Sequence, residues 1–405
     1  MYLERPEQPI AGLSHLRADL SRTSLANAVV GFVFAASGPL AVILAVGTKG
    51  GLAEQQIASW VFGAFFINGL LSIAISLVYR QPLVFFWTIP GTVLVGPALT
   101  HLTFPEVVGA FVVTGALMLA LALSGFVRRS MEAIPMPIVM GMVAGVFLQF
   151  GLDWVRAFAV DLRIALPMTF AFLVLMRMPK IAATVPPLIG ALLVGVAAVL
   201  WTETFTPVAS EGAMFAAPHL VTPIFSWQAI AELVVPLAIT VLVVQNGQGI
   251  AVLTATGHRP PVNSIAAACG VGSLISAFVG TASTCLTGPV TAILSGSGKP
   301  ETQYTSAIIV GLLALAFGLF APMFTRLLLA APAVFIATLA GLAMLKVLQT
   351  AFTIAFQGRY GFGTLITFLI TVTGMSIFSI GAPFWGILFG YIASRLLEPD
   401  DFKTA

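Results

Sequence analysis

Long apolar runs separated by short polar stretches fill most of this chain. A helix needs about 20 predominantly apolar residues to cross the hydrocarbon core of a bilayer. Runs of roughly this length fall at 24–46, 56–78, 104–126, 133–152, 163–178, 182–201, 228–252, 262–280, 303–323, 327–348, 361–378 and 382–397. The pattern predicts an all-α integral membrane protein, with a polar loop between its two sets of crossings.

The stretch 83–99 is apolar, but its pattern is not that of one helix. Its sequence, LVFFWTIPGTVLVGPAL, is interrupted at Pro90 and Gly91 and again near Pro97. Proline and glycine break or weaken the hydrogen-bond ladder of a helix interior, whereas the aromatic residues before Pro90 favour extended chain. A helix can begin near Pro90, because its missing N–H costs nothing there. The stretch therefore predicts a short extended segment followed by a half-helix.

A second stretch of this kind, STCLTGPVTAI at 283–293, follows about 200 residues later. A pair of short hydrophobic segments interrupted by Gly and Pro, at matching places in two halves, indicates the substrate site of a secondary transporter. With these two segments we expect about 14 crossings, of which the third and the tenth are broken.

An internal repeat supports this division into halves. The dipeptide Ala144-Gly145 recurs as Ala340-Gly341, and Gly115 recurs as Gly311, both 196 residues later. This offset spans seven expected crossings, and an odd number reverses orientation, so the halves would be inverted repeats related by an axis in the membrane plane. The alternative is chance recurrence of the abundant Gly and Ala residues.

Composition and charge agree with a membrane protein. Charged residues make up 8% of the chain and hydrophobic residues 59%, whereas soluble domains contain about 25% charged residues. With a cytoplasmic N-terminus, 14 crossings place all but four of the 18 Lys and Arg residues on the cytoplasmic side, the exceptions being Lys49, Arg156, Arg163 and Arg326. This asymmetry obeys the positive-inside rule and predicts two cytoplasmic termini. The net charge of +3 reflects orientation in the membrane and indicates no nucleic-acid partner.

Several function classes are disfavoured by the sequence. Cys269 and Cys285 lie in apolar segments, which argues against a disulfide framework. The dipeptide Gly298-Lys299 is followed by Pro300, whereas a phosphate-binding loop has Ser or Thr after its Gly-Lys. This argues against an ATP-driven pump. The spans hold no metal-ligand cluster and no Ser–His or paired-Asp arrangement, so we expect no cofactor and no enzyme. A passive channel is an alternative from another class.

Polar side chains reach the centre of the eighth crossing. Gln245, Asn246 and Gln248 lie in VVQNGQGIAV, and amides can bind a carboxylate or an uncharged ring without burying a charge. The alternative role is hydrogen bonding between helices. Glu232, one turn inside this crossing, is a candidate for proton coupling because charges within spans are usually functional; the alternative is that it reaches the outer interface. His101 is a weaker candidate and is more typical of a solvated loop.

Two opposed half-helices can form an anion site. Helix N-termini carry unpaired N–H groups and a partial positive charge, so the ends near Gly91 and Pro289 would hold an anion between them. Threonine hydroxyls would add donors, and Phe34, Phe85, Phe86 and Trp87 would form an aromatic wall unless they face lipid or the protein core. In the first crossing, Ser37-Gly38-Pro39 is expected to loosen the helix. The predicted substrate-binding residues are Phe34, Ser37, Gly38, Trp87, Thr88, Gly91, Thr92, Gln245, Asn246, Gln248, Thr287, Gly288 and Thr291.

Over nearly its whole length the sequence resembles the BenE family of bacterial benzoate transporters. The motifs that carry the resemblance are SGPLAV at 37–42, YRQPLVFFWTIPGTVLVGPAL at 79–99, MRMPKIAATVPPLIGALLVG at 176–195, VVQNGQGIAV at 243–252 and TGPVTAILSGSG at 287–298. The resemblance implies proton-coupled import of benzoate across the inner membrane. It also implies kinship with nucleobase–ascorbate and sulfate-type carriers, which have two inverted sets of seven spans, a core domain, a gate domain and substrate between the broken segments.

Mapped onto this chain, the resemblance implies a core and a gate that are each made of two parts. The expected segments are a cytoplasmic tail at 1–22, the core at 23–126 and 228–323, the gate at 127–201 and 324–397, an outer loop at 202–227 and a cytoplasmic tail at 398–405. A homodimer is a candidate assembly, and the sequence leaves the oligomeric state open.

One departure from the wider group concerns the proton. Uracil-type relatives place carboxylates on the eighth and tenth spans, where this chain has Gln245, Asn246 and the threonines from Thr284 to Thr291. We therefore expect the proton to travel on or beside the substrate carboxylate, with Glu232 as the alternative carrier. A carrier of the same fold for a nucleobase or a small inorganic anion is the alternative function.

Overall fold

The computed structural model describes residues 2–131, 134–178, 181, 185–204, 213–296, 298–377 and 380–403. Parts of the expected outer loop and C-terminal tail, at 205–212 and 404–405, lie outside the described residues, and so does Ser297 in the TGPVTAILSGSG motif. By their internal contacts the residues form two compact units. Unit 1 comprises Met1–Phe32, Ala58–Ala133 and Met214–Pro322, and unit 2 comprises Val33–Ile57, Ile134–Ala213 and Met323–Ala405. This division differs from the expected core and gate mainly at residues 33–57, and the assignment as core and gate stays a prediction.

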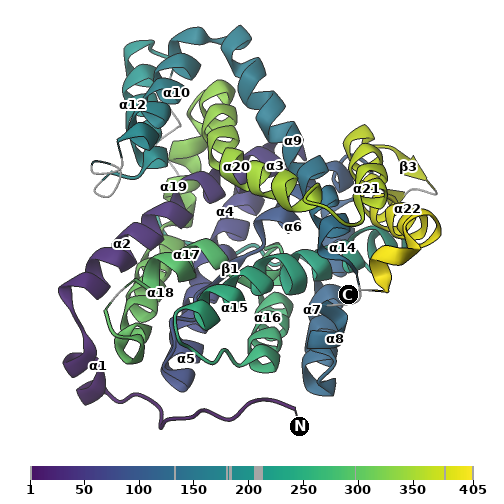
Figure 1. Cartoon of the computed structure of the whole chain (residues 1–405). Helices are drawn as coiled ribbons and strands as arrows, with labels where there is room; N and C mark the ends of the chain where they lie inside the picture. Colours follow the sequence, from purple (N-terminus) through teal and green to yellow (C-terminus); the bar gives the residue numbers. More distant parts are fainter. Residues whose placement is uncertain are drawn as a thin grey trace. The chain divides into compact units, whose positions relative to one another are not determined.

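Unit 1 contains both broken segments (Figure 1). Its elements are α1 (Leu13–Asp19), η1 (Gly63–Ile67), α5 (Asn68–Tyr79), β1 (Phe85–Trp87), α6 (Ile89–Ala98), α7 (Phe104–Ser124), α8 (Val127–Met131), α13 (Trp227–Ala229), η2 (Ile230–Val234), α14 (Val235–Ile239), η3 (Thr240–Gln245), α15 (Asn246–Ala255), α16 (Val262–Ala277), β2 (Thr284–Leu286), α17 (Gly288–Leu294), η4 (Pro300–Thr302) and α18 (Tyr304–Leu319). Helices α2 (Arg22–Ala36), α4 (Glu54–Phe62) and α19 (Ala321–Leu329) pass from one unit into the other.

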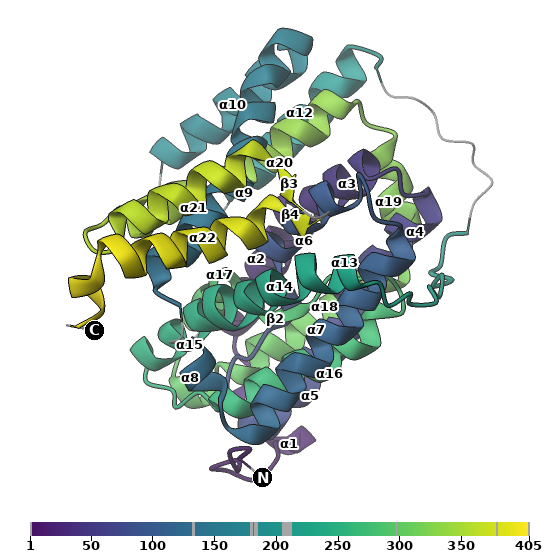
Figure 2. The same cartoon turned by 90° about the vertical axis from the view of Figure 1, so that its right-hand side faces the viewer.

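Unit 2 is built from long helices that pack in pairs. Its elements are α3 (Gly38–Lys49), α9 (Met136–Val160), α10 (Leu162–Arg177), α12 (Pro187–Trp201), α20 (Ala333–Ala355), α21 (Gly361–Thr373), β3 (Ser376–Ile377), β4 (Ile380–Gly381), α22 (Ala382–Leu397) and η5 (Pro399–Phe402). Within the unit, α9 packs against α20, α10 against α12, and α21 against α22. The last pair, drawn in yellow, runs side by side in Figure 2.

The helices account for the apolar runs, with several shifted bounds. Within the described residues, seven helical segments are long and apolar enough to cross a membrane, and shorter apolar helices such as α12, α16 and α22 occupy other expected crossings. The run at 361–378 is helical only to Thr373, because β3 follows, and the run at 327–348 is replaced by α19 and then α20. The break expected in the first crossing is present, since α2 ends at Ala36 and α3 begins at Gly38.

The segment Trp227–Ala255 is one long helical stretch that contains two π-helical turns, η2 and η3. The sequence pattern did not predict these turns. Pro236 has no N–H to donate to the carbonyl group of Glu232 four residues earlier, which explains why the regular α-helical ladder fails across η2. Such π turns within helices frequently mark functional sites.

Both broken segments have the predicted form, an extended stretch followed by a short helix. The extended parts pair as antiparallel strands, with Phe86 opposite Cys285 and Trp87 opposite Thr284. The ladder continues beyond the strands, because Thr88 N donates to Ser283 O over 2.9 Å and Thr287 N donates to Val84 O over 3.0 Å. The two copies of the broken segment therefore run in opposite directions.

Side chains of neighbouring helices occupy the outer edges of this two-stranded ribbon. A membrane interior offers no water to satisfy a strand edge. On the β1 side, the Ser72 hydroxyl of α5 accepts from Phe85 N over 2.8 Å and the Ser76 hydroxyl accepts from Leu83 N over 3.2 Å. On the β2 side, the Ser273 hydroxyl of α16 accepts from Thr284 N over 2.9 Å. The serines thus hold the ribbon between α5 and α16.

Glycines bring α5 and α18 into close contact. A Cβ atom on Gly69 would lie 2.9 Å from Gly311 O, and a Cβ atom on Gly311 would lie 2.9 Å from Gly69 O. Neither position accepts a larger side chain without moving the facing backbone. Small residues at such crossings are typical of membrane helix packing. The close approach fixes α5, whose serines hold β1.

Replacing Ser72 with alanine is expected to destabilise the protein. The substitution leaves the buried Phe85 N–H without its acceptor, and an unsatisfied buried donor costs about 1–3 kcal/mol. Thermal unfolding of the detergent-purified protein measures the effect. Ser124→Ala is the control, because Ser124 is exposed and bonds only the Leu121 carbonyl group of its own helix. Equal unfolding temperatures for the two variants would contradict this role of Ser72.

Candidate substrate site

The first half-helix begins at Thr88, which caps it. The Thr88 side-chain oxygen accepts from Gly91 N over 3.1 Å, and its hydroxyl donates to Thr240 Oγ1 in η3, also over 3.1 Å. Thr92, one turn later, donates to Thr88 O over 3.0 Å. Thr88 and Thr92 are fully buried, so both predicted hydroxyl donors are already engaged within the protein.

The second half-helix begins at the equivalent Thr287 but is bonded differently. Neither the Thr287 nor the Thr291 hydroxyl has a hydrogen-bond partner in the described part of the chain, although both side chains are more than nine-tenths buried. The hydroxyl of Ser283, which lies across the ribbon from Thr88, is in the same condition. A buried polar group without a partner is costly. Thr287 and Thr291 are therefore buried donors at the start of α17, and Ser283 is a buried donor beside the start of α6.

Trp87 adds an aromatic donor at the same end of the ribbon as Ser283, because it pairs with Thr284. Its indole Nε1–H is buried and has no partner among the residues that the structure describes. Its ring lies 5.1 Å from the ring of Phe65 and 5.8 Å from that of Phe86. Phe317 extends the cluster, with its ring 4.5 Å from Phe65. Phe85 instead packs into the apolar core around Leu286 and Cys285.

The three amides of the eighth crossing have different surroundings. The Asn246 side-chain oxygen accepts from Leu286 N over 2.8 Å, so this amide occupies the edge of β2 and has the structural role that the sequence left as an alternative. Gln245 is buried in η3, which contacts β2 and α6. Gln248 is exposed and packs on the first residue of α17, since a Cβ atom on Gly288 would lie 3.0 Å from its Oε1.

Gly91 lies where α6 approaches the eighth crossing most closely. A Cβ atom there would lie 2.9 Å from Leu237 Cδ2 and 3.1 Å from Thr240 Oγ1. The remaining predicted residues lie in the other unit. Phe34, Ser37 and Gly38 belong to unit 2, where Ser37 donates to Phe34 O over 3.0 Å.

Glu232 is buried and lies within hydrogen-bond distance of His101, the weaker of the two sequence candidates. The Glu232 side chain is 4% exposed, and its Oε2 lies 2.9 Å from His101 Nε2. Among the described residues, Glu232 is the one charged residue whose side chain is buried. The two residues are 131 positions apart in sequence, and no local pattern links them.

Ser283, Phe65 and Thr240 were missed by the sequence analysis. Phe65 and Thr240 lie in apolar runs where a ring or a single hydroxyl carries no signal. Ser283 lies within the second broken segment, which the sequence pattern identified. The pattern did not indicate that the Ser283 hydroxyl is a hydrogen-bond donor of the site.

The site is electrically neutral apart from the backbone. The residues around the starts of α6 and α17 carry hydroxyl, amide and aromatic groups but no basic side chain. The described residues contain no group of three His, Cys, Asp or Glu side chains that would hold a metal ion. Negative charge at the start of α6 is favoured by the partial positive charge of a helix N-terminus. The arrangement suits an anion held by neutral donors.

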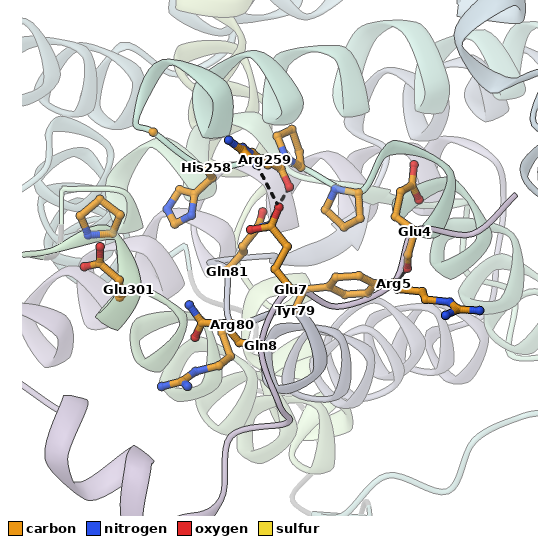
Figure 3. A pocket seen from close by; sticks show the side chains of 14 residues that line it. Glu4, Arg5, Glu7, Gln8, Tyr79, Arg80, Gln81, His258, Arg259 and Glu301 are labelled. Carbon is orange, nitrogen blue, oxygen red and sulfur yellow. Dashed lines mark hydrogen bonds and ion pairs between the residues drawn. The ribbon is translucent and has the colours of Figure 1, made fainter.

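A cavity of about 350 Å³ lies elsewhere in unit 1, beside the N-terminal segment (Figure 3). Its lining mixes both charge signs, including an ion pair of 3.6 Å between Glu7 and Arg259. Glu4 accepts hydrogen bonds from Asn263 N and Ser264 N, over 3.0 and 2.9 Å, and so caps α16. None of the predicted substrate residues lines this cavity, which indicates an anchoring role for the N-terminal segment.

A family model described as "Benzoate membrane transport protein" matches residues 18–396. The chain belongs to the BenE family. A BenE relative, the Benzoate membrane transport protein of Acinetobacter baylyi, is 27% identical over 390 residues, which cover 95% of this chain and 98% of that protein. The resemblance inferred from the motifs is thereby confirmed.

Solved structures with little sequence identity share the fold of this BenE chain. The transmembrane domain of the cyanobacterial bicarbonate transporter BicA gives a TM-score of 0.63 at 17% identity, covering 94% of this chain and 96% of that one. Murine Slc26a9, an anion transporter in the inward-facing state, gives 0.66 at 12% identity, covering 96% and 70%. Identities this low show the fold alone. They confirm the expected fold class, a multi-pass helical membrane fold with repeated halves and broken segments three and ten.

The two equivalent threonines are expected to respond oppositely to replacement by valine. Thr88→Val removes a helix cap and should lower stability by about 1 kcal/mol, whereas Thr287→Val removes a buried hydroxyl without a partner and should leave stability unchanged or raised. Thermal unfolding without ligand measures both. A larger loss for Thr287→Val than for Thr88→Val would contradict the hydrogen-bond assignment.

Proposed function

We propose that this BenE-family chain imports benzoate, or a similar small aromatic monocarboxylate, together with protons by alternating access of the elevator or rocking type. The family assignment and the name of the Acinetobacter relative support the substrate class. The basic residues of the expected loops support a bacterial inner-membrane location with both termini in the cytoplasm.

The observation that carries this proposal is the group of buried neutral donors along the ribbon, beside the starts of α6 and α17. Thr287, Thr291 and Ser283 hydroxyls and the Trp87 indole N–H lack partners among the described residues. A carboxylate has two oxygens with about four lone-pair sites, so it can accept from more than one donor beside the start of a half-helix. Hydrogen bonds to a charged group contribute about 1.5–3 kcal/mol each, and they hold an anion without burying a permanent positive charge.

The aromatic cluster beside these donors supports a ring-bearing substrate. Phe65, Phe86, Trp87 and Phe317 form contiguous ring contacts with centroid distances between 4.5 and 5.8 Å. Aromatic pairs are worth about 0.5–1.5 kcal/mol beyond the area that they bury. In the proposed complex the carboxylate faces the hydroxyl donors and the ring packs against this cluster.

Proton coupling is proposed on energetic grounds. Import of an anion against an inside-negative membrane potential costs roughly 2.3 kcal/mol per charge per 100 mV. A co-transported proton cancels the charge and adds the driving force of a pH gradient. Accumulation of a benzoate-like anion therefore needs such a co-ion.

A small inorganic anion is the second candidate, because the similar fold of BicA belongs to a bicarbonate transporter. The aromatic cluster favours the aromatic substrate over this alternative. A nucleobase is also disfavoured, because Glu232 is the one buried carboxylate among the described residues that could bind it.

Uptake of labelled benzoate by proteoliposomes under an inward proton gradient tests the proposal. Unlabelled benzoate is expected to compete, whereas bicarbonate, sulfate and uracil are not. Competition by bicarbonate alone would favour the inorganic-anion carrier.

Removal of the buried donors is expected to weaken benzoate binding. Thr287→Val and Thr291→Val should each raise the Kd about tenfold or more, since a hydrogen bond to a charged group is worth about 1.5–3 kcal/mol. Isothermal titration of the purified protein measures the Kd. Thr364→Val is the matched control, because this unit 2 hydroxyl is also buried without a partner among the described residues. An equal effect of all three substitutions would argue against a site at α17.

A further inference from the structure

We propose that His101 and Glu232 together bind the coupled proton and transmit its arrival to the substrate end of α6. This inference rests on the proposed function, because it assigns the proton of benzoate import to named residues. It departs from the expectation that the proton travels on the substrate carboxylate. It also gives His101 a role that the sequence pattern did not favour.

The first argument is the burial of the pair. Glu232 Oε2 lies 2.9 Å from His101 Nε2, with the Glu232 side chain 4% exposed and the His101 side chain 32% exposed. A buried carboxylate is costly unless a cation or a proton neutralises it. Histidine changes its charge between pH 5 and 8. The pair therefore combines a buried proton acceptor with a partner that is open to water.

The other charged groups near the pair are few. The elements packed against η2 are α6, α7, α13 and α14, and Glu106 is the titratable side chain within them. Glu106 lies near His101. Its carboxylate is engaged by Thr103, accepting from the backbone N over 2.9 Å and from the hydroxyl over 2.7 Å. Glu232 is thus the carboxylate that directly contacts His101.

The geometry gives the proton a defined path. His101 Nδ1 lies 3.3 Å from Thr100 Oγ1 on the more exposed side of the ring. Starting from a neutral imidazole with its proton on Nε2 and an ionised Glu232, Nδ1 takes a proton from water and Nε2 passes its own proton to Glu232 Oε2. The imidazole ends neutral, with its proton moved from Nε2 to Nδ1, and the carboxylate becomes a neutral acid. One proton has entered, and release reverses the same steps.

The second argument is the connection from this pair to the substrate site. His101 follows the end of α6, and its backbone N donates to Ala98 O over 3.2 Å. At the other end of α6, Thr88 donates to Thr240 Oγ1 over 3.1 Å. Glu232 and Thr240 belong to the same long helical segment, and they lie in its two π turns, η2 and η3. This segment therefore holds α6 at both ends.

Protonation changes the contact at one end of α6 and leaves the other in place. When the proton reaches Glu232, the charge-assisted hydrogen bond between its carboxylate and His101 Nε2–H is replaced by a weaker neutral hydrogen bond. The hold of η2 on the end of α6 loosens, and α6 shifts against the π-helical segment. Thr88 lies at the opposite end of α6, so the shift reaches Ser283, the proposed substrate donor across the ribbon from it.

His101→Gln and Glu232→Gln test the pair in proteoliposomes by two assays. Benzoate counterflow at equal pH measures substrate exchange without a gradient, and accumulation with a lumenal pH dye measures coupled proton flux. An inward gradient of one pH unit supports up to about tenfold accumulation for one proton per benzoate. Both variants are expected to retain counterflow, to lose this accumulation and the benzoate-dependent proton flux, and to flatten the pH dependence of counterflow between pH 5 and 8.

The matched controls are His258→Gln and Glu106→Gln. His258 bonds Gln303 over 2.7 Å and has no acidic partner in that contact, and Glu106 serves its helix cap. Both controls are expected to accumulate benzoate as the unaltered protein does. Where Glu232→Gln lowers thermal stability, Glu232→Asp replaces it and is expected to retain proton flux, while His101→Gln decides the proposal.

Two results have separate meanings. Full accumulation and proton flux in His101→Gln and Glu232→Gln would overturn the proton site while leaving benzoate import intact. Absence of benzoate counterflow in the unaltered protein would instead overturn the proposed function.

Discussion

The structure depends on satisfying the backbone of two broken segments within a membrane. An open strand edge is costly there because no water replaces the missing hydrogen bonds. The two extended stretches pair with each other, and Ser72, Ser76, Ser273 and Asn246 satisfy the outer edges. The half-helices can begin beside this ribbon only because it is closed on both sides. The small residues that pack α5 against α18 serve the same end, since they fix the helix that supplies two of these serines.

The two broken segments of unit 1 have the same form, but their threonine hydroxyls are bonded differently. Thr88 and Thr92 use their hydroxyls inside the protein, to cap α6 and to bind η3. Their counterparts Thr287 and Thr291 keep theirs without partners among the described residues. One copy is therefore stabilised by its hydroxyls, and the other retains the donors that we assign to the substrate. Repetition with unequal hydrogen bonding is a way in which a symmetric framework produces an asymmetric binding site.

The segment Trp227–Ala255 connects these features. Its first π turn carries Glu232 and its second begins at Thr240, and each of these residues contacts one end of α6 or the turn that follows it. Pro236 lies between the two turns and interrupts the ladder of hydrogen bonds. A helix of this kind tolerates local rearrangement more readily than a regular one. It is therefore suited to passing a change of charge from His101 to the start of α6.

The sequence by itself determined the membrane class, the two broken segments and the break at Ser37, because apolar length, proline and glycine act locally. Its BenE motifs also identified the family before any contact was known. The tertiary structure decided which hydroxyls remain without partners, that Asn246 supports β2, and that His101 meets Glu232 from 131 positions away. These outcomes depend on strand register and helix packing between distant segments. A hydrophobic pattern reports whether a position is buried, but the partner of a buried polar group is chosen only when the segments come together.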